Sequence, residues 1–317
     1  MIVRWGLDEL PGLLRELEVG RPFLVASPRW DDLGIAPAAR WDEIPSHRIE
    51  VPAGVDAVVA VGGGSAIDTA KAASAARDLP LVSVPTTYSG AEWTPFFGVR
   101  DSRSRRLHGG GGGARLAGIV YEPELTLDLP RDVSAGTALN ALAHSAEALY
   151  HPARTPESDR LAVEGAELIA GSLPDVVEHG GDLGPRTTLL RGAARAGEAL
   201  ARSGLCLGHA MAQALGGRYG LPHGAMNALC LPVALRFNEP VAAEAIEELG
   251  RAIGTNDAPG RVEELARLGG FERLRDFGVP EGELDDVAEA TAVRPGAKAN
   301  PRPASPAEIA ELYRSIY

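Results

Sequence analysis

Cysteine and long apolar runs are scarce in this sequence of 317 residues. The two cysteines, Cys206 and Cys230, supply neither a disulfide framework nor a CxxC metal motif, so we expect both to be reduced core residues. No apolar run approaches the roughly 20 residues that a membrane-spanning helix needs. The N-terminus lacks the basic and apolar regions of a signal peptide. These absences predict a cytoplasmic protein with no membrane partner.

Positive charge is in short supply as well. The formal net charge is −12 at pH 7, which argues against a nucleic-acid partner because such a partner would need a basic stripe on the protein. Lys71 and Lys298 are the only lysines. Hydrophobic residues make up 45% of the chain and charged residues 23%, which is the balance of a globular protein, and the length predicts two domains.

Short β-branched runs alternate with helical patterns through about the first 130 residues. This alternation predicts a parallel sheet covered by helices. The expected strands and helices are 23–27, 56–61 and 80–84, and 7–18 and 65–77. Two further strands within 96–122 predict a hairpin added to the sheet edge, with the five glycines at 109–113 as its flexible tip.

After Asp132 the pattern becomes entirely helical. Prolines and glycines such as Pro174 and Pro240 are expected to separate the helices. The expected helices are 135–150, 157–171, 186–203, 205–217, 225–237, 241–253, 260–268, 283–291 and 305–315. We therefore expect an α/β domain over residues 1–132 and an all-α domain over residues 133–317.

A run of three glycines follows the second expected strand. Gly62, Gly63 and Gly64 allow positive φ and a close approach of the backbone, and the helix that opens at Ser65 offers free N–H groups to a pyrophosphate. Ser65 and Asp68 have the spacing of a capping box. The segment is typical of a dinucleotide-binding loop, with a tight turn that binds nothing as the alternative.

Two threonines come at the end of the next expected strand. Ligands of open parallel sheets bind beyond the carboxyl ends of the strands. The hydroxyls of Thr86 and Thr87 are therefore placed to bond phosphate or ribose oxygens. A hydroxyl-capped turn is the alternative, and the neighbouring glycine run favours the ligand-binding interpretation.

Three histidines and one asparagine have meaningful spacing in the helical half. Asn140 and His144 are four residues apart and share a helix face, while His209 begins a helical segment and His223 follows 14 residues later. Three imidazoles suffice for a zinc site. Each histidine alone is more simply a hydrogen-bonded structural residue. Together the four predict a shared site, and a bound zinc or iron stays open because the fourth position is a neutral amide.

Several segments carry a resemblance to a known family. They are VVAVGGGSAIDTAK, VPTTYSGAEWTP, VYEPELTLDLP, ALNALAHSAEALY, GHAMAQALGGRYGLPHGAMNAL, LPVALRFN and NPRPAS. In this order and spacing the chain resembles the iron-containing alcohol dehydrogenase superfamily. Thr86-Thr87-Tyr88, Thr94-Pro95 and Asn140, where the alcohol dehydrogenases carry Asp, point to its maleylacetate reductase branch.

The resemblance implies an architecture and an activity. The architecture is that of the dehydroquinate synthase-like proteins, with a Rossmann-like dinucleotide-binding domain, an all-helical domain, the active site in the cleft between them, and a homodimeric assembly. The activity is the transfer of hydride from NADH or NADPH to a small, carboxylated enoate or carbonyl substrate.

The resemblance also assigns residues. The pyrophosphate loop matches Gly62, Gly63, Gly64 and Ser65. The threonines beside the phosphates match Thr86 and Thr87. The metal-site positions match Asn140, His144, His209 and His223, and the three histidines would polarise the acceptor oxygen directly or through a metal.

Other side chains are candidates for proton transfer and substrate binding. Tyr88 and Tyr219 are possible proton donors, with packing as the alternative for each. A carboxylated substrate needs a cation, and the candidates are Arg115, Arg218 and Arg236.

The chain departs from the superfamily pattern at two further places. Gln213 stands where a second histidine usually follows the position of His209, which puts the usual proton relay in doubt. Ser27 stands where an acidic residue often binds the adenosine ribose, and Arg29 follows it. The absence of a carboxylate at Ser27 predicts that NADPH is accepted.

Three other functions remain open. A metal-dependent alcohol dehydrogenase would act on a simple alcohol or aldehyde. A lyase or cyclase of the dehydroquinate-synthase type normally needs an acidic metal ligand and several lysines, which this lysine-poor chain disfavours. Asn140 and Gln213 also allow a nucleotide-binding relative that has no catalytic activity.

Overall fold

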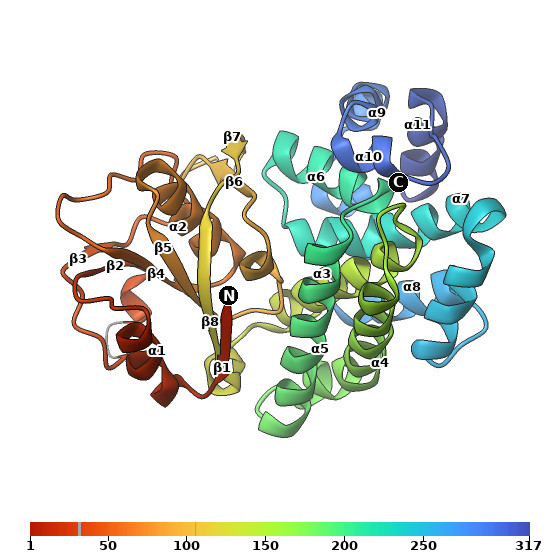
Figure 1. Ribbon diagram of the computed structural model, residues 1–317. Coiled ribbons are helices and arrows are strands. Elements are labelled where there is room, and N and C mark those ends of the chain that lie inside the picture. Colours follow the sequence, from red (N-terminus) through yellow and green to blue (C-terminus); the bar gives the residue numbers. More distant parts are fainter. Residues whose placement is uncertain (31–32, 105) are drawn as a thin grey trace. The chain divides into compact units, whose positions relative to one another are not determined.

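A computed structural model describes residues 1–30, 33–104 and 106–317 (Figure 1). The chain forms two compact units. Unit 1 contains residues 1–87 and 91–127, and unit 2 contains residues 88–90 and 128–317. The division after residue 127 lies slightly before the domain boundary that we expect from the sequence.

Unit 1 is built on a six-stranded sheet in which every neighbouring pair is parallel, so the predicted parallel sheet is confirmed. The strand order is β1-β8-β5-β4-β2-β3. The strands are β1 (Ile2–Trp5), β2 (Pro22–Ala26), β3 (Ala39–Trp41), β4 (Ala57–Gly62), β5 (Pro80–Pro85) and β8 (Arg115–Tyr121). The two edge strands, β1 and β3, escaped prediction because they are short and only partly buried.

The central strand β4 is buried on both faces. Val59 and Val61 belong to a core that contains the leucines of helix α1 (Leu10–Glu16). Val58 and Ala60 belong to a second core that contains apolar residues of helix α2 (Gly64–Arg77). Because successive side chains of a strand point to opposite faces, this continuous apolar run fixes a helix on each side of the sheet.

The glycine-rich hairpin differs from its prediction. Strand β6 (Phe97–Arg100) pairs antiparallel with β7 (Leu107–Gly111) in a separate two-stranded sheet, and the chain turns between them rather than at the glycines. A Cβ on Gly110 would lie 2.8 Å from the Phe97 carbonyl oxygen. The prediction of a flexible glycine tip was wrong, because glycines of this run lie within β7 and allow close strand contact.

Short 3-10 helices connect the elements of both units. They are η1 (Leu7–Glu9), η2 (Pro28–Trp30), η3 (Ala91–Trp93), η4 (Pro123–Thr126), η5 (Leu274–Phe277) and η6 (Glu281–Glu283). The predicted helix 7–18 is thus η1 followed by α1.

Unit 2 consists of helices in its described residues. They are α3 (Arg131–Tyr150), α4 (Pro156–Glu178), α5 (Leu183–Arg202), α6 (Leu207–Tyr219), α7 (His223–Ala252), α8 (Ala258–Leu268), α9 (Leu284–Ala292), α10 (Pro295–Ala299) and α11 (Pro306–Ser315). The predicted breaks at Pro174 and Pro240 were wrong, since α4 and α7 continue past them. The cost of a proline inside a helix shows in α7 as a kink, where Ala242 has φ −135° and ψ 26°.

Helix α3 forms the core of unit 2, where α4, α5 and α7 pack against it (Figure 1). Its residues from 134 to 150 are buried, apart from the half-buried Thr137. The start of α7 lies against α3 at two glycines, where a Cβ on Gly224 would be 2.3 Å from the carbonyl oxygen of Gly136. Polar side chains of α3 are therefore held inside the protein close to the first turn of α7.

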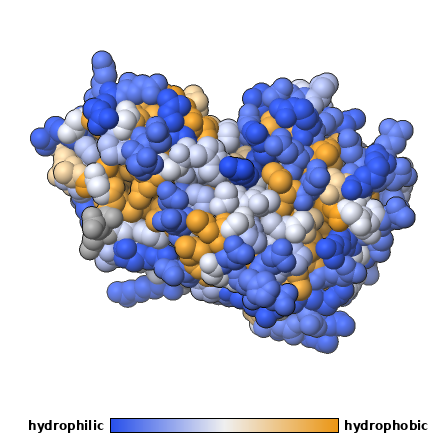
Figure 2. All heavy atoms as spheres, turned by 90° about the horizontal axis from the view of Figure 1, so that it is seen from below, coloured by the Kyte–Doolittle hydropathy of each residue, from blue (hydrophilic) through white to orange (hydrophobic). Residues whose placement is uncertain are grey.

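Hydrophilic side chains cover most of the face drawn in Figure 2, with scattered apolar patches among them. Within the described residues, no helix is both long enough and apolar enough to cross a membrane.

Candidate active site

The glycine loop of unit 1 lies at the carboxyl end of β4. Gly62 has φ +149°, and a Cβ there would be 2.7 Å from the Cβ of Ala66. A Cβ on Gly63 would be 2.8 Å from Cγ2 of Thr87. Gly62 therefore requires glycine, Gly63 leaves room for the Thr87 side chain, and the loop presents bare backbone at the start of α2.

The predicted capping box at this helix start was wrong. Helix α2 begins at Gly64, its N-cap is Gly63, and no side chain caps it. Asp68 instead accepts hydrogen bonds from the Nζ of Lys71 and the backbone N–H of Gly98, each at 3.2 Å. Because no side chain makes a hydrogen bond that caps this helix start, its first N–H groups and positive dipole end suit an anion such as a pyrophosphate.

The two threonines follow β5 beside this loop. The backbone N–H of Thr86 donates to the carbonyl of Gly62 at 3.0 Å. The hydroxyl of Thr87 is buried and has no hydrogen-bond partner among the described residues. Since buried hydroxyls are normally bonded, this orphan marks a place where a ligand could supply the missing partner.

Ser27 and Arg29 follow β2 at the same edge of the sheet. The carbonyl of Ser27 accepts a hydrogen bond from Arg40 at 2.7 Å, and the guanidinium of Arg29 lies 4.3 Å from the centre of the Trp30 ring. Because residue 27 is a serine, no carboxylate stands at the position where an acidic residue often binds the adenosine ribose.

The three predicted histidines come together inside unit 2. The rings of His144, on α3, and His209, on α6, are stacked with centroids 4.7 Å apart. His223, the first residue of α7, has its ring centroid 5.9 Å from that of His209. His144 and His209 are buried, whereas His223 is half-buried and is therefore the member most accessible to a small molecule.

Two amides connect these histidines to the backbone. Asn140 donates from Nδ2 to the carbonyl of Ser89 at 2.8 Å, which fixes the orientation of its amide. Its Oδ1 then accepts from Nδ2 of Asn227 at 2.6 Å, and the same Nδ2 lies 3.0 Å from Nε2 of His223. When the His223 ring is neutral, Nε2 accepts from this amide and the ring proton is on Nδ1. Nδ2 of Asn140 also faces Nε2 of His144 at 3.5 Å.

Three of the four predicted metal-site side chains are engaged in other contacts. The Oδ1 of Asn140 is already bonded to Asn227, and the Nε2 atoms of His144 and His223 face amide N–H groups rather than a common centre. Within the described residues, no three His, Cys, Asp or Glu side chains are grouped to hold a metal ion.

A buried carboxylate, Glu147, holds the third histidine. Its Oε2 lies 2.9 Å from Nδ1 of His209, and it also accepts from the backbone N–H groups of Cys206 and His209. Sequence reasoning missed Glu147 and Asn227, although each lies one helical turn after a predicted histidine, at the (i, i+3) spacing from His144 and the (i, i+4) spacing from His223.

The environment keeps His144 neutral. Burial lowers the pKa of His144 well below its usual value, and the neighbouring His209 and His223 lower it further.

The two cysteines are not placed to act as nucleophiles. Both are free and buried, as predicted, and burial together with the charge of Glu147 raises the pKa of each thiol.

The two candidate tyrosines have other partners. Tyr88 is fully buried, and its hydroxyl accepts a hydrogen bond from Nη1 of Arg186 at 3.1 Å, which favours the packing alternative. Tyr219 donates to Glu283 at 2.9 Å, and burial followed by this hydrogen bond raises its pKa to about 12. Gln213 lies half-buried on α6, one turn after His209.

The three candidate arginines are engaged in surface ion pairs. Arg115 pairs with Asp78 at the amino end of β8, the opposite end of the sheet from the glycine loop. Arg218 pairs with Glu283. Arg236 pairs with Glu263. Each of the three arginines thus already has a carboxylate partner at the surface, and their role as substrate-binding cations stays a prediction.

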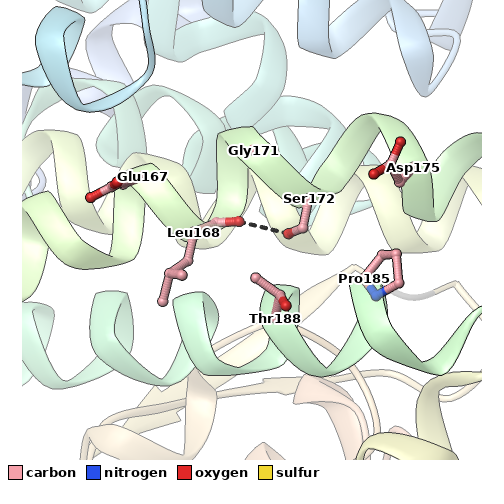
Figure 3. Close-up of a pocket in the computed structure, with 7 residues that line it drawn as sticks. All are labelled: Glu167, Leu168, Gly171, Ser172, Asp175, Pro185 and Thr188. Carbon is pink, nitrogen blue, oxygen red and sulfur yellow. Dashed lines mark hydrogen bonds between the residues drawn. The ribbon is translucent and has the colours of Figure 1, made fainter.

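A surface hollow of about 330 Å³ lies between α4 and α5 (Figure 3). Within it, the hydroxyl of Ser172 donates to the carbonyl of Leu168 at 2.6 Å. The lining residues are Glu167, Leu168, Gly171, Ser172, Asp175, Pro185 and Thr188. None of them is a predicted site residue, so the hollow has no part in the site.

Comparison with known families identifies the class of protein. Residues 134–317 match the model of the Fe-containing alcohol dehydrogenase family, C-terminal, and residues 49–111 match that of iron-containing alcohol dehydrogenase. The chain belongs to the iron-containing alcohol dehydrogenase family.

Within this family, the chain is most like maleylacetate reductase. It is 35% identical over 267 residues to the maleylacetate reductase of Burkholderia cepacia, covering 83% of this chain and 74% of that one. It is 33% identical over 311 residues to that of Pseudomonas aeruginosa, covering 90% and 88%. The crystal structure of maleylacetate reductase from Agrobacterium tumefaciens matches with a TM-score of 0.86 and 28% identity, covering 100% and 95%. The chain is thus an NAD(P)H-dependent reductase.

Proposed function

We propose that the protein reduces a small, carboxylated enoate or carbonyl compound, with maleylacetate as the first substrate to test. The observation that carries this proposal is the cluster of His144, His209 and His223 beside neutral amides, in which the half-buried His223 has an imidazole N–H to offer to a substrate. The similarity to maleylacetate reductases supports the same class of substrate. The predicted homodimer and cytoplasmic location stay predictions.

The proposed chemistry assigns one task to the glycine loop and another to the histidine cluster. NADPH or NADH would bind through the glycine loop, with Ser65, Thr86 and Thr87 beside its phosphates, and supply a hydride with its two electrons to the electrophilic carbon. The N–H of His223 would donate a hydrogen bond to the acceptor oxygen and stabilise the negative charge that develops there. A proton from water or a side chain would complete the reduction.

Arg294 is our candidate for the substrate carboxylate. It precedes α10, which packs on α6, the helix of His209. Its Nε is buried and has no hydrogen-bond partner among the described residues, and burial lowers the pKa of its guanidinium. A partly buried cation is stabilised by an anion, so this arginine suits a carboxylate better than the three surface arginines do.

The direct test is a substrate panel. The purified protein is incubated with NADH or NADPH and maleylacetate, other enoates, 2-oxo acids and simple aldehydes, and cofactor oxidation is followed by absorbance. We expect the highest kcat/KM with a carboxylated acceptor. Turnover of simple aldehydes alone, with a requirement for zinc or iron, would favour the metal-dependent alcohol dehydrogenase. No oxidation with any acceptor would favour a non-catalytic relative or a lyase.

We expect relaxed cofactor preference. Ser27 lacks the carboxylate that would repel a 2′-phosphate, and Arg29 is two residues away. Measuring kcat/KM for NADPH and NADH with the same acceptor tests this. A preference for NADH above about 100-fold, some 2.7 kcal/mol, would contradict the expectation.

We expect the purified protein to carry substoichiometric metal and to keep much of its activity after chelation. The Asn140 amide is a poorer ligand for a divalent cation than a carboxylate. Asn140→Asp should raise metal occupancy and should also lower the stability of the metal-free protein by about 1–3 kcal/mol, because a carboxylate oxygen would then face the Ser89 carbonyl.

Elemental analysis and thermal unfolding with and without zinc decide this for both forms. The zinc-dependent gain in stability should appear in the variant and be small in the parent. Full occupancy of the parent, with activity lost on chelation and restored by zinc or iron, would show that the amide had not disabled the site.

A further inference from the structure

Glu147, on α3, has a buried carboxylate whose hydrogen bonds go to the start of α6. Glu147 is 0% exposed, and His209 is its only ion-pair partner among the described residues. Its Oε2 accepts from the N–H of Cys206 at 2.6 Å and faces Nδ1 of His209 at 2.9 Å, while its Oε1 accepts from the backbone N–H of His209 at 3.0 Å. All of the observed bonds of this carboxylate therefore go to one short stretch of chain.

Part of this pattern anchors a helix. Cys206 is the N-cap of α6 and has no side-chain capping bond of its own, so Glu147 satisfies the first N–H groups of α6 from another helix. A Cβ on Gly208 would lie 2.9 Å from Oε1 of Glu147, so the glycine makes room for the carboxylate. This anchoring alone would be structural.

The contact of Glu147 with the imidazole ring of His209 also determines which ring nitrogen carries the proton. A carboxylate only accepts hydrogen bonds, so Nδ1 of His209 carries the proton. Nε2 of His209 is buried and has no partner among the described residues, whereas the Nε2 atoms of His144 and His223 face amide N–H groups. An unsatisfied buried nitrogen is costly, which indicates that a ligand or a water molecule supplies a partner when the enzyme works.

We infer that Glu147 is a positioning residue for the reduction and acts through His209. It fixes the ring in the Nδ1–H tautomer and so keeps Nε2 as a hydrogen-bond acceptor inside the histidine cluster, for a polar hydrogen of the bound substrate or of a water molecule. The ring of His209 also lies beside both His144 and His223. The kinetic part of this inference rests on the proposed function.

A double-mutant cycle tests the coupling. Removal of a group that orients a metal-bound histidine typically costs about 10–100-fold in metal affinity or activity, and we take the same range for a histidine that contacts substrate. We expect Glu147→Gln to lower kcat by about 10–100-fold with little change in the KM for NADPH, and to have almost no further effect in a His209→Gln background. Rescue of part of kcat by Glu147→Asp would support a requirement for the carboxylate. Equal losses in both backgrounds would overturn the inference and leave Glu147 as a helix anchor.

Asn300→Ala is the matched control. Asn300 is buried and accepts from the N–H of Leu207, the next residue of the same helix start, without contacting the histidine rings. We expect this variant to lower the melting temperature as Glu147→Gln does and to keep kcat near that of the parent. A similar loss of kcat in Asn300→Ala would show that any weakening of the α6 start reduces activity.

Nitrogen NMR of histidine-labelled protein provides a test that needs neither a substrate nor a variant. We expect a protonated Nδ1 and an unprotonated Nε2 for His209. The opposite tautomer would overturn the inference even if the enzyme reduces the proposed substrates. The expected tautomer in a protein that oxidises no cofactor would leave the positioning of His209 intact and reject only the proposed function.

Discussion

Gly63→Val is expected to abolish dinucleotide binding. A Cβ at this position would lie 2.8 Å from Cγ2 of Thr87, and valine adds two further methyl groups at the N-cap of α2. The pyrophosphate could then no longer approach the backbone. We expect the dissociation constants for NADPH and NADH, measured by calorimetry, to rise more than about 100-fold, which corresponds to about 2.7 kcal/mol.

Gly12→Val is a suitable control for this variant. Gly12 lies on α1 of the same unit, and a Cβ there would meet only the end of the Arg15 side chain, at 3.8 Å. We expect this control to bind the cofactor as the parent does, with both variants giving the circular dichroism spectrum of the folded protein. Unchanged cofactor affinity in Gly63→Val would mean that the loop is not the phosphate site.

His223→Ala is expected to reduce kcat by about 10²–10⁴-fold, the range for loss of a positioned acid–base or hydrogen-bonding group. His223 is the half-buried member of the cluster, and the amide of Asn227 directs its proton to Nδ1. Because the glycine loop belongs to unit 1, cofactor affinity should stay close to that of the parent.

His179→Ala provides the comparison for His223→Ala. His179 is an exposed residue at the end of α4 and has no part in the cluster. We expect it to keep the activity of the parent enzyme in the same assay. If His223→Ala also retained full activity, the histidine cluster would have no direct part in hydride transfer.

The sequence predicted the elements whose patterns are local. The buried β-branched runs of β2, β4 and β5 and the glycine loop after β4 are readable because burial on both faces needs uninterrupted apolar residues. The edge strands and the hairpin were missed or misplaced, since they depend on contacts with distant segments. The role of Gly110, for example, is set by Phe97 across the ladder.

The candidate site shows the same division between local and distant contacts. The spacing of Asn140 and His144 on one helix reveals a shared face, and the same reasoning applied to Glu147 and Asn227 would have added both. No local pattern shows that Glu147 bonds a residue 62 positions later in the chain. The ion pairs of the three candidate arginines could not be foreseen for a related reason, because their carboxylate partners lie far away in sequence.

The contact of α3 and α7 has a consequence for any effort to change what the enzyme accepts. At Gly136 and Gly224 the two backbones touch, so there is no smaller residue to which either position could change. This close contact fixes the distance between the two helices, and that distance allows Asn227 to donate a hydrogen bond to Asn140. We therefore expect smaller side chains around His223 to widen the substrate range, and a larger residue at Gly136 or Gly224 to disturb the hydrogen bond between Asn227 and Asn140.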